Sequence, residues 1–178
     1  MMKATGIVRR IDDLGRVVIP KEIRRTMRIR EGDPLEIYTD REGGVIFKKY
    51  SPVGEMPEEA QGWCDTLQKS CGMAAAVFDR DEVIACAGVP KAKTMEQKIT
   101  PELDALLEKR AFYTAPAGKP GIPLGPEGYS VAALMPIISE GDVIGGVASL
   151  TPAPREVGEP ESSLIRTAGI YLGRHMES

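Results

Sequence analysis

A chain of 178 residues with 42% hydrophobic and 28% charged residues is typical of a soluble globular protein with one medium domain or two small ones. Its net charge of −3 is the sum of a basic part and an acidic part. Residues 1–50 contain 12 Lys and Arg against 8 Asp and Glu, whereas residues 51–178 contain 11 Lys and Arg against 18 Asp and Glu. With no apolar run near the ~18 residues of a membrane span and no secretory signal, the sequence predicts a cytoplasmic protein whose basic part has an anionic partner.

The basic part contains four short β-branched runs and one short helix, with turns rich in Gly and Asp between them. Pro20 ends the second run and starts the helix predicted at residues 21–27. A unit this small has little core of its own and no cysteine to staple it, so we expect an obligate dimer. The four strands are predicted at residues 6–11, 16–19, 35–38 and 45–50.

The pattern breaks at residues 51–57, which contain two prolines and one glycine. The sign of the charge also changes at this point. We therefore expect an N-terminal domain at residues 1–52, a linker at 53–55 and a C-terminal domain at 56–178.

The C-terminal part alternates helices with pairs of strands. Residues 113–128 hold four Pro and four Gly and are expected to form a long loop. This order of elements, a run of hairpin strands with helices on one side, predicts an α+β sandwich. The helices are predicted at 58–70, 101–112 and 161–177, and the strands at 74–78, 83–87, 129–138 and 143–150.

The sequence offers no catalytic or metal-binding pattern. Cys64, Cys71 and Cys86 lack Cys-x-x-Cys spacing, and His175 has no companion for a triad or a metal site. The cysteines are expected to be small buried apolar residues, with a redox switch as the alternative. We expect a protein that is not an enzyme and that holds neither a metal nor a cofactor.

Arginine outnumbers lysine eight to four in the basic part. The planar guanidinium suits phosphates and guanine edges, so this composition favours nucleic-acid binding. The alternative is an ordinary solvated face, because interleaved carboxylates could pair with the arginines at i,i+4 spacing. These carboxylates are Asp12, Asp13, Glu22 and Glu31.

Residues 3–26, above all the run Leu14-Gly-Arg-Val-Val-Ile-Pro20, closely resemble the N-terminal domain of the AbrB-type transition-state regulators. Residues 31–38 and 45–50 carry the same resemblance. It implies that two chains interleave their hairpins into one swapped-hairpin β-barrel dimer. A dimer of this kind agrees with the small size of the unit.

This resemblance also implies that the partner is double-stranded DNA, bound by arginines of the first hairpin and the helix. The resemblance also implies flexible, AT-rich promoter targets without a strict consensus. The protein would then recognise the shape of the DNA rather than the edges of its bases. Carried over by motif, the DNA-binding residues are Arg9, Arg16, Arg24 and Arg25, with Arg10 and Lys3 as contacts to the DNA backbone.

The total length, the Ser51-Pro52 break and the segment after it resemble the stage V sporulation protein T family of spore-forming bacteria. That resemblance implies a C-terminal GAF-like domain and a role as an activator or repressor of sporulation genes. In a GAF-like domain, a small molecule is expected to bind beneath the middle helix and the long loop. The candidate lining residues are Phe78, Asp79, Cys86, Tyr113 and Tyr129.

The first and last helices of the C-terminal part each have one apolar face and can pair between copies. If both domains self-associate with different partners, a homotetramer results. Three alternatives stay open: an antitoxin-like protein whose main partner is a toxin, an enzyme acting near residues 113–128, and a GAF-like domain that only assembles subunits. No membrane partner is expected.

Overall fold

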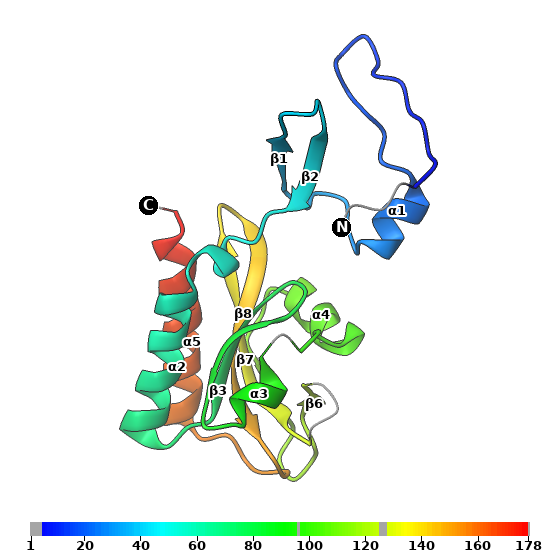
Figure 1. The fold of residues 1–178 in the computed structure, drawn as a ribbon. Coiled ribbons are helices and arrows are strands. Elements are labelled where there is room, and N and C mark those ends of the chain that lie inside the picture. The colour runs from blue at the N-terminus through cyan, green and yellow to red at the C-terminus, as the bar shows by residue number, and fades with distance from the viewer. Residues whose placement is uncertain (1–4, 96, 125–127, 178) are drawn as a thin grey trace. The chain divides into compact units, whose positions relative to one another are not determined.

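The computed structural model describes residues 5–95, 97–124 and 128–177, and the chain divides into two compact units, Met1–Tyr50 and Ser51–Ser178 (Figure 1). Each unit has its own sheet. Within the described ranges, no helix is both long and apolar enough to cross a membrane. The elements of the first unit are α1 (Lys21–Thr26), β1 (Leu35–Thr39) and β2 (Val45–Lys49).

Strands β1 and β2 form an antiparallel hairpin in which Ile37 lies opposite Phe47. Asp40 shapes the turn, because its Oδ1 accepts hydrogen bonds from the backbone N–H of Glu42 (2.9 Å) and of Gly44 (2.7 Å). A Cβ built on Gly44 would lie too close to Oδ2 of Asp40, so a larger residue there would displace this carboxylate. The hairpin predicted for the second half of the basic part is confirmed.

Residues 5–19 form an arm without regular strands, although the sequence predicts strands at 6–11 and 16–19. The backbone hydrogen bonds within this segment are those of its turn, from Asp12 N to Arg16 O (3.0 Å) and from Gly15 N to Asp12 O (3.0 Å). A β-strand needs a neighbouring strand to bond with, and no other described segment of this chain supplies one. The two strand predictions are therefore wrong for a single chain.

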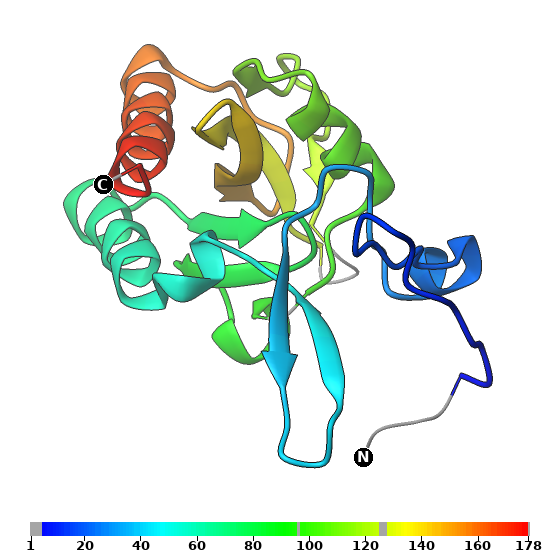
Figure 2. The same cartoon turned by 90° about the horizontal axis from the view of Figure 1, so that it is seen from above.

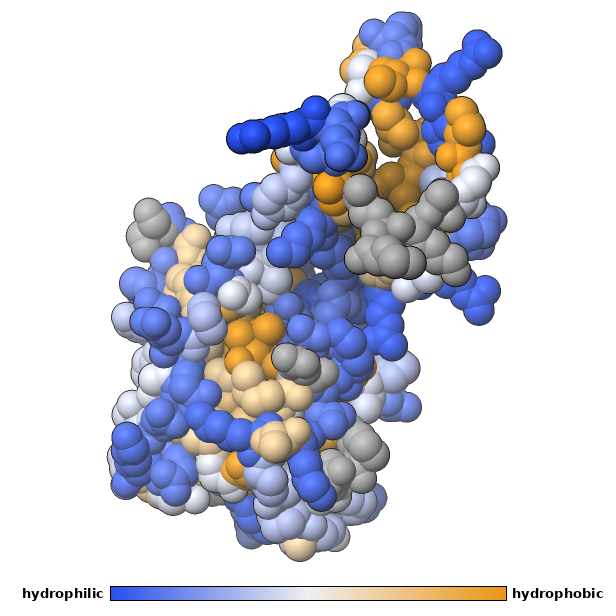
Figure 3. Space-filling view, viewed as in Figure 1, coloured by the Kyte–Doolittle hydropathy of each residue, from blue (hydrophilic) through white to orange (hydrophobic). Residues whose placement is uncertain are grey.

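None of residues 5–50 is buried in the single chain, although many of them are apolar. Figure 3 shows apolar side chains at the surface of this unit. A unit whose large hydrophobic residues all remain in contact with solvent has no core of its own. The exposed ones are Ile7, Val8, Ile11, Leu14, Val17, Val18, Met27, Ile37, Tyr38, Val45, Ile46, Phe47 and Tyr50.

The second unit is built on one antiparallel sheet with the strand order β4-β3-β8-β7-β5, and β6 also pairs with β7. Its helical elements are η1 (Val53–Glu55), α2 (Pro57–Cys71), α3 (Lys91–Thr94), α4 (Pro101–Glu108) and α5 (Glu159–His175). Its strands are β3 (Ala75–Asp79), β4 (Val83–Ala87), β5 (Tyr113–Thr114), β6 (Ile122–Pro123), β7 (Ser130–Ser139) and β8 (Asp142–Thr151).

Two apolar clusters cover the two faces of this sheet. Helices α2 and α5 lie side by side on one face, where Leu67 and Ile165 belong to a buried cluster. Helix α4 covers the opposite face, where Leu103 and Leu107 pack with Phe78 (Figure 2). The α+β sandwich predicted from the order of elements is confirmed, but its helices cover both faces of the sheet and not one: α2 and α5 lie on one side and α4 on the other.

Several boundaries differ from the sequence-based expectation. Helix α4 ends four residues early because Arg110 adopts a left-handed backbone (φ 53°), which a helix cannot continue. The expected loop at 113–128 contains the short strands β5 and β6, which pair with β7. The residues expected to be a linker, 53–55, form η1, and Val53 is 1% exposed in the core of the second unit.

Candidate nucleic-acid interface

The tip of the N-terminal arm is a tight turn organised by Asp12. Its Oδ1 accepts hydrogen bonds from the backbone N–H of Leu14 (3.0 Å) and of Arg16 (2.7 Å). Its Oδ2 accepts a hydrogen bond from Arg16 Nε at 2.8 Å. The backbone N–H of Arg16, followed by its side chain, holds the pKa of Asp12 below its usual range. Gly15 completes the turn with a φ of 76°, which favours glycine.

Five of the six predicted DNA contacts are exposed on the first unit, and the sixth, Lys3, lies outside the described residues. In the part of the chain that the structure describes, Arg16 pairs with Asp12, and the other four arginines form no ion pair. Most of these guanidinium groups are therefore available to an anionic partner instead of being paired along the chain. The five are Arg9, Arg10 and Arg16 on the arm, and Arg24 and Arg25 in the last turn of α1.

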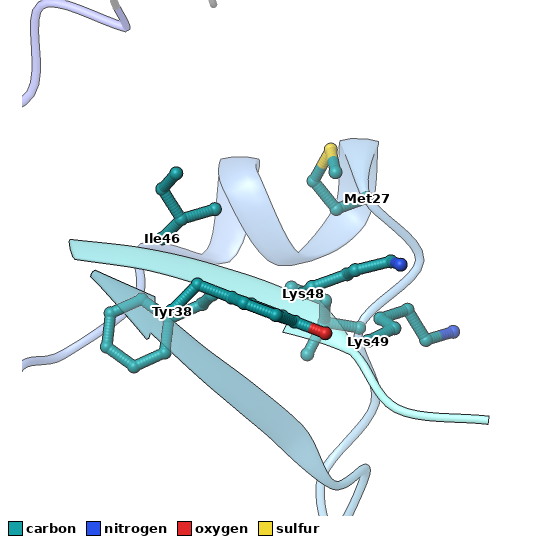
Figure 4. Close-up of a pocket in the computed structure, with 7 residues that line it drawn as sticks. Met27, Tyr38, Ile46, Lys48 and Lys49 are labelled. Atoms are coloured by element: carbon teal, nitrogen blue, oxygen red, sulfur yellow. The ribbon is translucent and has the colours of Figure 1, made fainter. Parts of the chain in front are cut away.

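An open apolar groove of about 630 Å³ lies between the end of α1 and the β1–β2 hairpin (Figure 4). Its lining is largely apolar, with lysine side chains at one end. A groove of this composition is suited to bury apolar side chains rather than to bind phosphate. The lining residues are Met27, Ile29, Tyr38, Ile46, Phe47, Lys48 and Lys49.

Four of the five predicted ligand-binding residues meet in the cluster beneath α4. Phe78 and Cys86 are fully buried there, and Tyr113 and Tyr129 are partly buried against the same cluster. The centre of this face is closely packed, since a Cβ built on Gly146 would lie 2.9 Å from both Phe78 and Leu134. A ligand that bound at this point would have to displace apolar side chains.

The fifth residue, Asp79, has a different position. Its Oδ1 accepts hydrogen bonds from the backbone N–H of Asp81 (2.7 Å) and of Glu82 (2.8 Å), which shapes the turn between β3 and β4. Its Oδ2 accepts a hydrogen bond from the hydroxyl of Ser51 at 2.7 Å. Asp79 thus holds the first residue of the second unit in place, and this contact across 28 residues has no signal in the sequence.

The cysteines and the acidic residues offer no metal centre within the described ranges, where no group of three or more potential ligands comes together. Burial raises the pKa of the Cys64 thiol to about 12, and burial also raises the pKa of Cys86. Both thiols therefore stay protonated and unreactive at neutral pH. Cys64 and Cys86 thus confirm the expectation of small buried apolar residues, but the expectation is wrong for Cys71, which is exposed at the end of α2.

The fold of the second unit is that of GAF domains. A GAF domain from an Acinetobacter phosphoenolpyruvate-protein phosphotransferase covers 72% of this chain and 84% of its own length, with a TM-score of 0.55 and 9% identity. A type II free methionine-R-sulfoxide reductase from Thermoplasma acidophilum covers 70% of this chain and 94% of its own length, with a TM-score of 0.52 and 10% identity. At these identities the likeness shows the fold alone.

An arginine-rich unit without a core, followed by a GAF-type sandwich, is the architecture of a two-domain transcription factor. The model of the stage V sporulation protein T C-terminal family, described as a transcription factor, matches residues 55–177. "Stage V sporulation protein T" of Bacillus subtilis is 45% identical over 99% of both chains. The chain belongs to the stage V sporulation protein T family.

Two further matches concern the first unit. The "Transition state regulatory protein AbrB" of Bacillus subtilis is 65% identical over 51 residues, which are 29% of this chain and 52% of that protein. The model of the MazE bacterial antitoxins matches residues 8–55. The match over the full length is to a sporulation protein, so the transcription-factor interpretation is favoured over the antitoxin alternative.

Proposed function

We propose that the first unit binds duplex DNA and that the protein thereby regulates genes of sporulation. The observation that carries this proposal is the set of exposed arginines on the arm and on α1. The transition state regulator that is 65% identical to this unit has an N-terminal domain described as a DNA recognition domain. Arginine forks suit phosphate oxygens, and shape readout suits AT-rich targets. The proposed contacts are Arg9, Arg16, Arg24 and Arg25, with Arg10 and Lys3 on the backbone.

The test is binding of the full chain to a labelled AT-rich duplex, followed by fluorescence anisotropy across a salt series. We expect tight binding whose affinity falls steeply with salt, because each neutralised phosphate releases counterions. Absence of binding at low salt would contradict the proposal. It would favour a protein partner for the basic face, which is the antitoxin-like alternative that the match at residues 8–55 represents.

We also propose that two first units interleave their hairpins into a swapped-hairpin dimer, with the apolar groove and the apolar side of the arm in their shared interface. This proposal is supported by the exposure of most large hydrophobic residues of the unit, none of which is buried, and by the lack of strand pairing in the described part of the arm. A second copy would supply both the missing core and the missing strand neighbours. Association would also place two sets of arginines on one particle, which raises the positive potential toward DNA.

A second contact between copies is proposed at α2 and α5, which would complete a homotetramer. An aromatic row crosses these helices: Trp63 lies 5.4 Å from Tyr171, and Tyr171 stacks on His175 at 5.7 Å between ring centroids. Tyr171 and Ile170 are each 49% exposed. Exposed aromatic and aliphatic side chains on a helix pair are typical of helix-bundle contacts between subunits.

Replacing Tyr171 with glutamate is expected to convert the tetramer into a dimer. A charge placed at an apolar helix contact should weaken assembly there by roughly 100-fold. Analytical ultracentrifugation measures the change. Ala117→Glu, which adds the same charge at an exposed loop position, is the control and should leave the tetramer intact. A Tyr171→Glu protein that sediments like the parent would exclude this face.

The second unit is further proposed to regulate DNA binding, either by sensing a small molecule beneath α4 or by setting the oligomeric state. A structural link supports this proposal. Arg80 donates hydrogen bonds from Nε (3.2 Å) and Nη2 (2.9 Å) to Asp104 on α4, and it also pairs with Glu108. The adjacent Asp79 holds Ser51, where the first unit begins its connection to the second. Movement of α4 would therefore be passed to this connection.

Arg80→Gln is expected to loosen this connection. Loss of a partly buried charged hydrogen-bond group should raise amide hydrogen exchange of residues 51–56 by roughly tenfold. Exchange of the full-length protein, followed by mass spectrometry, measures it. The control is Arg155→Gln, which removes a comparable pair with Glu161 far from this turn in sequence. Equal effects of the two variants would indicate general destabilisation and contradict the link.

A further inference from the structure

Asp12 holds the Arg16 side chain at its Nε atom. Its carboxylate bonds the backbone of the turn with Oδ1 and the Arg16 guanidinium with Oδ2, the latter at 2.8 Å from Nε. The Arg16 side chain is 70% exposed and that of Asp12 is 36% exposed. A long, mostly exposed side chain at the tip of an arm is thus held at its Nε atom, and its terminal nitrogens make no hydrogen bond to the described residues.

Nothing else described in the chain orders Arg16, since its ion pair with Asp12 is the one that the structure gives it. An arginine that is ordered only on binding loses rotamer freedom at that step. A carboxylate that bonds Nε leaves the two terminal nitrogens, Nη1 and Nη2, for a bidentate contact with phosphate or base. The negative charge of Asp12 acts in the opposite sense, because it repels phosphates.

The neighbouring carboxylate, Asp13, separates these two effects. It carries the same charge one residue away, is exposed, and makes no hydrogen bond or ion pair in the described part of the chain. A purely electrostatic role would make the two positions equivalent. A positioning role would belong to Asp12 alone.

We propose that Asp12 is a positioning residue for DNA recognition, which holds the Arg16 guanidinium in its binding orientation by accepting a hydrogen bond from Nε. This inference rests on the proposed function of Arg16. Because bonding to Arg16 keeps the pKa of Asp12 below its usual range, the carboxylate is charged throughout the neutral pH range. The contact is therefore present at every pH at which the protein is expected to act.

The experiment compares Asp12→Asn with Asp13→Asn in the full-length protein. An asparagine at position 12 retains an oxygen for the backbone bonds of the turn but presents an N–H₂ to Arg16 Nε, so it removes the positioning contact and keeps the turn. We expect Asp12→Asn to weaken binding of an AT-rich duplex by roughly fivefold to tenfold. Asp13→Asn should bind as tightly as the parent or slightly more tightly, since it loses only a repelling charge.

The same change in an Arg16→Ala background shows whether Asp12 acts through Arg16. We expect no further loss of affinity from Asp12→Asn in that background. A loss of the same size there, or equal affinities of the Asp12→Asn and Asp13→Asn proteins, would overturn the proposal. Circular dichroism and sedimentation of each variant would reveal a loss of fold or assembly.

A readout without DNA keeps this proposal distinct from the proposed function. The Nε–H of Arg16 should exchange slowly with solvent in the parent and in Asp13→Asn, and faster in Asp12→Asn, as seen by ¹⁵N NMR of the side chain. If Arg16→Ala binds DNA as tightly as the parent, the proposed role of Arg16 fails even when the protected Nε–H is present. If the Nε–H is unprotected in the parent, the positioning contact fails even when DNA binds.

Discussion

Arg24→Ala is expected to weaken binding of an AT-rich duplex by roughly 10-fold to 100-fold at low salt. Arg24 is exposed in the last turn of α1, and in the described part of the chain it has no acidic partner. A symmetric dimer loses two guanidinium groups at once. If each of them contacts one phosphate, the slope of log affinity against log salt should fall by about 2. Fluorescence anisotropy across a salt series measures both quantities, and Arg16→Ala is expected to behave similarly.

The matched control is Arg41→Ala. Arg41 is also an exposed arginine of the basic unit, but it lies in the turn between β1 and β2, outside the predicted contact set. Its removal subtracts the same charge, so it should change the affinity only slightly. If Arg41→Ala and Arg24→Ala reduce the affinity and the salt slope equally, the basic unit attracts DNA by its overall charge, and the specific assignment of Arg24 is wrong.

The second unit was predictable from its sequence because its signals are local. A threonine directly before a proline is typical of a helix start, and Thr100 is the N-cap of α4, where its Oγ1 accepts a hydrogen bond from Leu103 N at 3.2 Å. The end of α4 was not recognised, because Arg110 takes a left-handed backbone that no glycine announces. The short strands β5 and β6 were missed for another reason. Each of these strands has only two residues, and each is defined by its pairing with β7.

The candidate site was predictable to the extent that residue type determines it. Exposed arginines of a basic unit can be expected from composition, and Arg9 and Arg24 are indeed exposed. The bond from Arg16 to Asp12 had a signal as well, since an Asp that begins a turn ending in Gly commonly bonds the backbone that follows. The link from Arg80 to Asp104 had none, because it joins residues 24 apart through the packing of α4.

The strands predicted in the arm are absent from the single chain for a physical reason. Both β-branched runs have the composition of strands, yet in the described part of a single chain neither of them pairs with a strand. Strand propensity describes how well a residue fits a pleated, half-buried surface, and that surface must be supplied by a neighbour. Many of these residues are also apolar and exposed, so the proposed pairing with a second copy of the chain would explain both the lack of strand pairing and the lack of a core.

Phe47→Asp tests that explanation and is expected to abolish the structure of the first unit. Phe47 lies on β2 and lines the apolar groove, with 42% of its surface exposed in the single chain. In the proposed swapped-hairpin dimer, an aspartate there would by symmetry bury two charges in a largely apolar interface. Each costs several kcal/mol, which together exceed the stability of about 5 kcal/mol at the lower end for small domains. DNA binding should be lost with the fold.

The second unit should survive this change, since it has its own core and its own proposed contact between copies at α2 and α5. Phe47→Asp should therefore sediment as a dimer in which residues 5–50 exchange their amide protons freely and residues 57–175 remain protected. Arg41→Asp, a change of charge in the turn of the same hairpin, should leave the first unit folded. A Phe47→Asp protein with a protected first unit would show that this unit stands alone.

Combining Phe47→Asp with Tyr171→Glu separates the two proposed contacts. If they are independent surfaces, each single variant should leave a dimer, although a different one, and the double variant should be a monomer. Only the Tyr171→Glu dimer should bind DNA, because it alone keeps the paired first units and their arginines. A double variant that still sediments as a dimer would require a third contact between copies. Pairing between first units would then not account for the exposed apolar residues of the arm by itself.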